Sequence, residues 1–191
     1  MYAALLADGR LYELLQRCDE DLAAEQRAAG CPICGAPLHS ARYPRKPRGV
    51  VGRLSPEYQW RQSFCCAQRD CRKRVTPVSL RFLGRKVYVG AVVALISALR
   101  CGPTPARMRI LEDLVGVSRR TLARWRRWWC EGLVDTPFWR VASGAVMPPV
   151  QRAELPAALL ERFTGSARER LLALLRFIAP ITSASATVHV S

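Results

Sequence analysis

Cysteine constrains the fold of this chain more than any other residue type, because five of the eight cysteines fall into two groups. The first group is the sequence CPICG at residues 31–35, in which proline and glycine allow a tight turn that points both sulfurs inward. The second group is CCAQRDC at residues 65–71. Two such groups, joined by a segment that can form strands, are typical of a closed four-thiolate zinc site. We therefore predict a structural Zn²⁺ ion with the ligands Cys31, Cys34, Cys66 and Cys71.

The third ligand has to be chosen from two adjacent cysteines. Cys66 is preferred over Cys65 because Phe64 stands two residues before it, and strand alternation directs residues i and i+2 to the same side. His39, five residues after Cys34, is an alternative ligand. The remaining cysteines have no partner at ligand spacing and are expected to be buried free thiols: Cys18, Cys101 and Cys130.

A second pattern, LVGVSRRTLARWRRWW at residues 114–129, predicts a turn followed by an amphipathic helix. Ser118 is a good N-cap residue, because its hydroxyl can accept a backbone N–H that the first turn leaves unpaired. Beyond it, Leu122, Trp125 and Trp129 recur at spacings of three and four and form one apolar stripe. The arginines of this segment fall mostly outside the stripe, so the helix has an apolar side and a basic side.

A supporting helix is predicted over residues 106–114, since Thr104 can cap it and Pro105 suits its first turn. Both helices together form the pattern of a helix-turn-helix, whose second helix presents its early residues to base edges in the major groove. Arginine suits this task because its planar fork pairs with O6 and N7 of guanine. A packed helix with a solvated basic face is the alternative. The predicted DNA contacts on this helix are Ser118, Arg119, Arg120, Thr121, Arg124 and Arg127.

Positive charge is concentrated in the middle of the chain. The formal net charge is +15, of which residues 1–30 carry −3, residues 31–140 carry +16 and residues 141–191 carry +2. This distribution favours a nucleic-acid partner, because phosphate neutralisation releases condensed counterions. An irregular, proline-broken loop over residues 42–49 lies between the cysteine groups, and a merely solvated loop is its alternative reading. The predicted phosphate contacts are Arg42, Arg45, Lys46 and Arg48 in this loop, and Arg72, Lys73 and Arg74 after the second group.

The predicted fold is mainly α-helical with a small β zinc ribbon, a helix-turn-helix domain and C-terminal helices. The last of these helices begins with a capping box of Ser166 and Glu169. The predicted domains of the chain are an N-terminal helical arm (1–30), a zinc ribbon (31–84), a helix-turn-helix domain (85–135), a linker with C-terminal helices (136–180) and a flexible tail (181–191). Within them we expect helices over 3–29, 85–99, 155–163 and 167–179, a strand over 59–64 and an irregular segment over 136–149.

Several functional classes are disfavoured by the sequence. No apolar run approaches the 20 residues of a membrane span, and no secretory signal is recognisable near the amino terminus. We therefore expect a cytoplasmic protein with reduced thiols that is not associated with a membrane. The chain contains only two histidines, no Ser/His/Asp set and no glycine loop for phosphates, so we expect no enzymatic activity.

With both patterns placed, residues 31–130 resemble the DNA-binding front end of bacterial insertion-sequence transposases, in which a zinc ribbon precedes a helix-turn-helix. The segments that carry the resemblance are CPICG at 31–35, RQSFCC at 61–66, CRKRVTP at 71–77 and VSRRTL at 117–122. The second cysteine spacing is four residues where these ribbons have two, and Val75 stands where they have an aromatic residue. Catalysis in such transposases needs carboxylates that hold two metal ions, and after Leu133 the only acids are Asp135, Glu154, Glu161 and Glu169.

The resemblance thus implies a stand-alone bacterial DNA-binding protein, associated with the nucleoid, and not a transposase. We predict a zinc-dependent, sequence-specific binder of double-stranded DNA that acts as a transposase-related accessory factor or as a transcriptional regulator. Its expected protein partners are a second copy in a homodimer or a mobile-element recombination protein. The alternatives are an RNA-binding protein, or a protein-interaction module without specific nucleic-acid binding.

Overall fold

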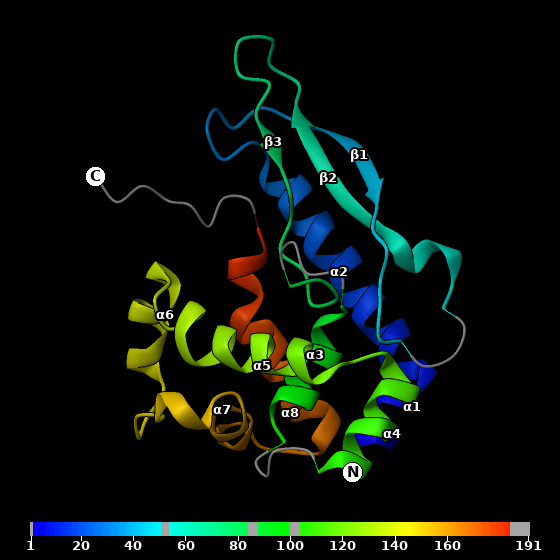
Figure 1. Cartoon of the computed structure of the whole chain (residues 1–191). Coiled ribbons are helices and arrows are strands. Elements are labelled where there is room, and N and C mark those ends of the chain that lie inside the picture. Colours follow the sequence, from blue (N-terminus) through cyan, green and yellow to red (C-terminus); the bar gives the residue numbers. More distant parts are fainter. Residues whose placement is uncertain (1, 51–53, 84–87, 100–103, 184–191) are drawn as a thin grey trace.

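The computed structural model describes residues 2–50, 54–83, 88–99 and 104–183. Helices make up most of this part, and a small antiparallel sheet extends from one end of the helical body (Figure 1). The helices are α1 (Tyr2–Ala7), α2 (Gly9–Ala29), α3 (Gly90–Ser97), α4 (Pro105–Val115), α5 (Arg119–Arg127), α6 (Pro137–Ala142), α7 (Ala157–Arg162) and α8 (Ala167–Ile178). The strands, in spatial order, are β1 (Leu38–Pro44), β2 (Trp60–Cys66) and β3 (Arg74–Val75). A mainly helical fold with a small sheet is therefore confirmed.

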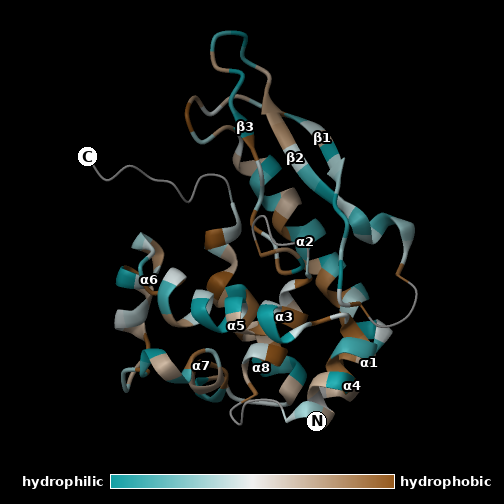
Figure 2. Cartoon of the chain, viewed as in Figure 1, coloured by the Kyte–Doolittle hydropathy of each residue, from teal (hydrophilic) through white to brown (hydrophobic). Residues whose placement is uncertain are grey.

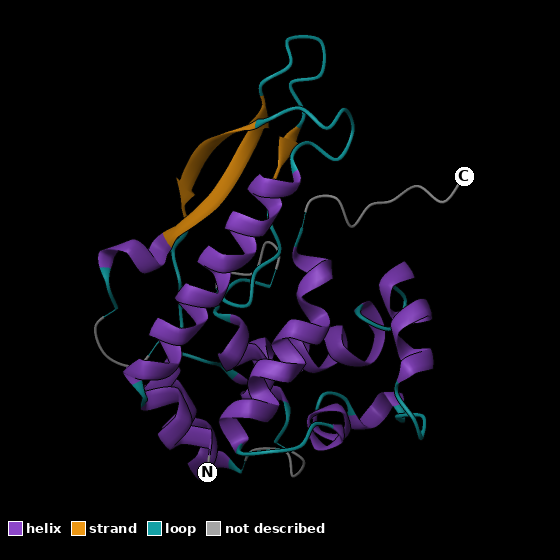
Figure 3. Cartoon of the chain, turned by 180° about the vertical axis from the view of Figure 1, so that it is seen from behind, coloured by secondary structure: helices purple, strands orange, loops and turns teal. Residues whose placement is uncertain are grey.

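The amino-terminal segment forms two helices where one was predicted over residues 3–29. Asp8 adopts an extended backbone conformation, and its carboxylate accepts the backbone N–H of Arg10 at 3.0 Å, which caps the start of α2. The acidic cap is the physical reason for the break. The helix α2 then runs along the back of the sheet (Figure 3) and ends at Gly30, whose positive φ of 76° suits glycine.

The main hydrophobic core lies in the helical body around α3, whose eight residues are all buried. This helix packs against α1, α5 and α8. A helix was predicted over 85–99, and residues 84–87 lie outside the described chain. The prediction is wrong for residues 88–89 and 98–99: Tyr88 and Val89 form isolated β-bridges, and the helix extends only over Gly90–Ser97. A second, smaller core lies between α2 and the sheet and consists of Ala23, Cys31, Leu38, Phe64, Cys66 and Val75.

Strand β1 pairs with β2 along its whole length, from Leu38 opposite Cys66 to Pro44 opposite Trp60. The prediction of an irregular loop over 42–49 is therefore wrong for its first three residues. Pro44 is tolerated because β1 is an edge strand at the end of the sheet. The backbone N–H of Arg45 still donates to the carbonyl of a β2-flanking residue, Gln59, at 2.7 Å, so the irregular part begins after Arg45.

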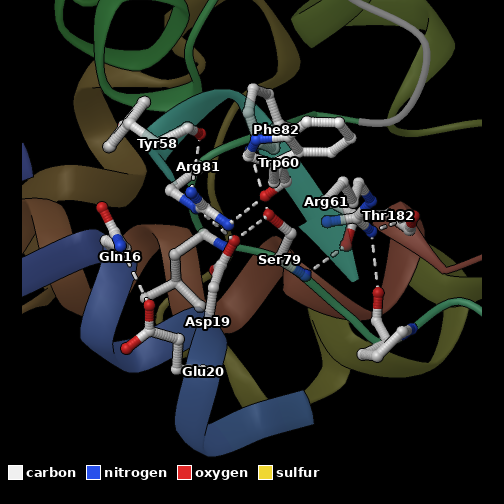
Figure 4. Close-up of polar contacts among 12 residues, drawn as sticks. Gln16, Asp19, Glu20, Tyr58, Trp60, Arg61, Ser79, Arg81, Phe82 and Thr182 are labelled. Atoms are coloured by element: carbon white, nitrogen blue, oxygen red, sulfur yellow. Dashed lines mark hydrogen bonds and ion pairs between the residues drawn. The ribbon is translucent and has the colours of Figure 1, made fainter. Parts of the chain in front are cut away.

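A buried polar cluster joins the sheet to the helical body (Figure 4). The carboxylate of Asp19, on α2, accepts hydrogen bonds from the hydroxyl of Ser79 at 2.5 Å and from the backbone N–H of Leu80 at 2.6 Å. It also pairs with the guanidinium of Arg81 at 2.8 Å. Arg81 in turn donates to the carbonyl of Trp60, the first residue of β2, at 3.0 Å. The segment after β3 is thus held simultaneously to α2 and to β2.

The carboxy-terminal tail was predicted to be flexible from residue 181, and this is wrong for residues 181–183. Thr182 ends a short 3₁₀ helix, Ala179–Thr182, and is buried. Its hydroxyl accepts the backbone N–H of Ser79 at 2.8 Å, and its carbonyl accepts a bond from Arg61 at 3.2 Å. These partners lie more than 100 positions earlier, so no local pattern indicates them. Residues 184–191 of the predicted tail lie outside the described chain.

The predicted irregular segment over 136–149 is also partly wrong, since it contains α6. Thr136 caps this helix by accepting the backbone N–H of Trp139 at 3.1 Å, and Pro137 occupies its first position. Closer to the carboxy terminus, the capping box predicted at the start of α8 is confirmed. Ser166 and Glu169 each accept the other's backbone N–H.

Candidate metal centre and basic surface

Four cysteine thiols converge at the end of the sheet that lies farthest from the helical body. The sulfur atoms of Cys31, Cys34, Cys66 and Cys71 all lie within 4.8 Å of one another. The Cys31 and Cys71 sulfurs are 3.7 Å apart, and the Cys34 and Cys66 sulfurs are 3.4 Å apart. Four sulfurs about 2.3 Å from a Zn²⁺ ion in a tetrahedron would lie about 3.8 Å from one another. The predicted ligand set is confirmed as a cluster at metal-binding distance.

The first pair of ligands is held by a tight turn directly after α2. The N–H of Gly35 donates to the carbonyl of Cys31 at 2.8 Å, and the N–H of Cys31 donates to the carbonyl of Ala36 at 2.9 Å. Gly35 has a φ of +70°, a conformation that glycine adopts without strain. Gly30 allows the backbone of Gly35 to pack closely against it, because a Cβ atom at Gly30 would lie 2.7 Å from the carbonyl oxygen of Gly35.

The second pair of ligands comes from β2 and from the loop that follows it. Cys66 is the last residue of β2, and its N–H donates to the carbonyl of Lys73 at 2.9 Å. The loop folds back because the N–H groups of Cys71 and Arg72 both donate to the carbonyl of Gln68, at 3.2 and 3.0 Å. Arg72 has a positive φ of 43°, which completes the reversal of the chain.

Strand alternation correctly separates the two adjacent cysteines. Cys66 and Phe64 are both buried on the side of the sheet that faces the small core. Cys65 lies on the opposite side, opposite His39 in the register, and its thiol is 3.7 Å from the carbonyl of Arg72. Neither Cys65 nor His39 belongs to the cluster. Of the predicted buried thiols, Cys18 is buried and Cys130 is half-buried, whereas Cys101 lies outside the described residues.

The four thiols are not electrostatically equivalent. A hydrogen bond from the backbone of Ile33 lowers the pKa of Cys31 to about 7, whereas burial raises the pKa of Cys66 to about 12. A metal ion must therefore displace a proton from Cys66 when it binds, as is usual for thiolate sites. Four protein ligands leave no open coordination position, so this arrangement suits a structural ion and not metal-centred catalysis.

The helices α4 and α5 are joined by a three-residue turn. Gly116 has a φ of +66°, Val117 is fully buried, and the hydroxyl of Ser118 accepts the backbone N–H of Thr121 at 3.3 Å. The predicted N-cap is thus confirmed. The helices also match the predicted ranges closely. α4 ends one residue beyond the predicted Leu114, and α5 is continued by a π-helical turn, Trp128–Gly132.

Two sides of α5 differ sharply in burial and charge. Leu122 and Trp125 are buried, and Trp129, in the π-helical turn, is fully buried. The opposite side is exposed and hydrophilic (Figure 2). Of the predicted contacts, Ser118, Arg119, Arg120, Arg124 and Arg127 are exposed, and Thr121 is half-buried. The Ser118 hydroxyl is also engaged with that of Thr121 at 3.1 Å, so these two side chains have a structural role in the cap.

Comparison with known protein families, curated proteins and solved structures finds no match. Within the described residues, no helix combines the length and the apolar character that crossing a membrane requires. The functional assignment therefore depends on the thiol cluster and on the distribution of charged side chains over the fold.

The basic residues between the cysteine groups differ in their surroundings. Arg42 is exposed, pairs with Glu57 at 2.7 Å and stacks over the ring of Trp60, 4.6 Å from its centroid. Arg45 is half-buried, and its guanidinium lies 5.6 Å from the ring centroid of Phe82. The side chains of the other two predicted contacts in this segment are exposed: Lys46 and Arg48.

The exposed residues Arg72, Lys73 and Arg74 belong to the loop between β2 and β3 and to the first position of β3. This end of the sheet lies far from α5 (Figure 1). The structure therefore does not bring all predicted contacts together. It divides them into a group at the thiol cluster and a group on α5, and the 45–48 segment precedes both groups in the chain.

Sequence reasoning missed Tyr88, which lies just before α3. Its hydroxyl donates to the carbonyl of Gly116 in the α4–α5 turn, at 2.7 Å. The segment VYVG at 87–90 was assigned to a buried apolar helix, and in such a helix a tyrosine does not indicate a specific contact. The only available signal was the need of a tyrosine hydroxyl for a hydrogen-bond partner.

Proposed function

We propose that the protein is a zinc-stabilised binder of double-stranded DNA, in which α4 and α5 act as a helix-turn-helix. The observation that carries this proposal is the asymmetry of α5. One side is buried through Leu122 and Trp125, while Arg119, Arg120 and Arg124 are exposed on the other side. A helix of this kind, placed after a short capped turn, has the composition needed to enter the major groove and read guanines.

Zn²⁺ is the proposed metal because the four donors are all thiolates. Soft sulfur ligands in a closed tetrahedral set favour zinc over magnesium, calcium or manganese. In this role the ion holds the turn at 31–35 against the loop at 66–71, and it thereby presents Arg72, Lys73 and Arg74 at the end of the sheet. These three side chains would contact phosphates without reading sequence.

The biological role that we propose follows from the resemblance to insertion-sequence transposases. The protein would be a non-enzymatic accessory factor of a mobile element, or a transcriptional regulator derived from one. It would act as a homodimer or together with a recombination protein. RNA binding is the second candidate function, supported by the same arginine-rich surface.

The deciding experiment is selection of duplexes from a random pool by the zinc-loaded protein at near-physiological salt. A recovered motif is the expected result, and a two-fold symmetric motif would indicate a dimer. Binding without a motif that disappears as salt rises would reduce the proposal to phosphate contacts alone. Preferential binding of structured RNA in competition would favour the second candidate, and no binding of either would favour a protein-interaction module.

A further inference from the structure

The α4–α5 turn is tied to Tyr88, which precedes Gly116 by 28 residues. Tyr88 donates its hydroxyl hydrogen to the carbonyl of Gly116, and its ring packs edge-to-face on Trp125 with the centroids 4.8 Å apart. Gly116 is the residue at which the chain reverses after α4, and Trp125 belongs to the buried side of α5. A single side chain therefore contacts both the turn and the helix that follows it.

The backbone of the same tyrosine pairs with the basic segment. Tyr88 forms a parallel bridge with Arg48, and the N–H of Val89 donates to the carbonyl of Arg48 at 3.1 Å. Gly49 permits this close packing, because a Cβ atom there would lie 3.1 Å from Cδ1 of Tyr88 and 3.0 Å from Cγ1 of Val92. The backbone of residues 48–49 is thus fixed against Tyr88, while the Arg48 side chain is exposed.

We propose that Tyr88 is a positioning residue that holds Arg48 beside the α4–α5 turn, so that Arg48 contacts a phosphate of the same duplex whose groove α5 enters. The inference rests on the proposed function and adds to it how two basic segments, far apart in the sequence, act on one DNA molecule. A phosphate contact at this place fixes the orientation of α5 relative to the groove. Loss of the Tyr88 hydroxyl then weakens discrimination between sequences more than it weakens binding to DNA in general.

The test uses the full-length, zinc-loaded protein and two labelled duplexes, one recovered by selection and one with the same bases in scrambled order. Tyr88→Phe removes the hydroxyl and keeps the ring. We expect the affinity for the selected duplex to fall about three- to tenfold, the range of one hydrogen bond, with little change for the scrambled duplex. Arg48→Ala is expected to reduce the slope of log K against log salt by about 1 for both duplexes.

Tyr12→Phe is the matched control, because the hydroxyl of Tyr12 also donates to a backbone carbonyl, that of Leu6, at 2.7 Å. This bond is buried, and neither of its partners belongs to the α4–α5 turn or to α5. Tyr12→Phe is expected to lower the melting temperature without changing the ratio of the two affinities. An equal loss of discrimination in both tyrosine variants, or none in Tyr88→Phe, would overturn the inference alone. A wild-type protein without any preferred duplex would overturn the proposed function and the inference with it.

Discussion

Asp19 and Arg81 form a buried ion pair, 62 positions apart in the sequence, with 2.8 Å between Oδ2 and Nε. Their side chains are only 6 % and 4 % exposed. Removing two charges from water is costly, and here the cost is offset because the remaining hydrogen-bonding capacity is used. Arg81 also donates to the carbonyls of Tyr58 and Trp60, at 2.7 and 3.0 Å. The pair therefore joins α2 to the first residue of β2 and to the chain just before it.

The first prediction concerns this pair. Asp19→Ala leaves the Arg81 guanidinium buried without its counter-charge, and we expect the free energy of unfolding to fall by about 3–5 kcal/mol. Urea denaturation followed by circular dichroism measures the change. Glu20→Ala is the control, because the neighbouring Glu20 is exposed and accepts a hydrogen bond from Gln16 in an exposed helical pair. Its loss is expected to cost less than about 0.5 kcal/mol. Equal destabilisation by both substitutions would contradict the assigned role of the ion pair.

The second prediction distinguishes the adjacent cysteines. Cys66→Ser removes a member of the thiol cluster, so the purified protein is expected to lose most of its bound metal. Cys65→Ser leaves the cluster intact and is expected to retain one metal ion per chain. Elemental analysis by mass spectrometry gives the stoichiometry, and substitution with Co²⁺ gives an absorption spectrum that reports tetrahedral thiolate coordination. Retention of the ion by Cys66→Ser, with loss in Cys65→Ser, would show that the ligand assignment is reversed.

The third prediction concerns the glycine that ends α2. Gly30→Ala places a Cβ atom 2.7 Å from the carbonyl oxygen of Gly35 at a residue with positive φ, so the turn that carries Cys31 has to shift. We expect weaker metal binding and a lower melting temperature. Gly9→Ala, at the other end of the same helix, meets no atom within 4 Å and is expected to be neutral or slightly stabilising. Competition with a chromogenic chelator compares the affinities, and identical values for both variants would exclude a strained turn.

The fourth prediction separates base contacts from phosphate contacts. Arg120→Ala is expected to relax the preference at one base pair, at a cost of about 1–3 kcal/mol for the preferred base. Lys73→Ala, near the thiol cluster, is expected to weaken binding to all duplexes alike and to reduce the salt slope by about 1. Both side chains are exposed, so little change in stability is expected from either substitution. Uniform weakening by Arg120→Ala would make Arg120 a phosphate contact.

Local patterns in the sequence were sufficient to select the four cysteines of the thiol cluster and to predict α5. Cys66 was distinguished from Cys65 because strand alternation depends only on neighbouring residues, and the structure buries Cys66 with Phe64. The Ser118 cap and the apolar stripe were predictable for the same reason, since a helix repeats over three or four positions. Thr136 and Pro137 also formed a local start signal for α6, which was overlooked because nearby prolines and a glycine suggested a linker.

The sequence by itself indicated the four thiols, through the ligand spacing of two cysteine groups. It also indicated the two sides of α5 and the cap of α8, through short-range patterns. Only the tertiary structure decided the contacts between distant segments, namely Asp19 with Arg81, Thr182 with Ser79, and Tyr88 with Gly116. Each of these bonds depends on how complete helices and strands pack against one another. The identity of a single polar residue therefore does not indicate its distant partner. Burial in the packed chain selects such pairs, because a polar group removed from water is stable only where a partner meets it.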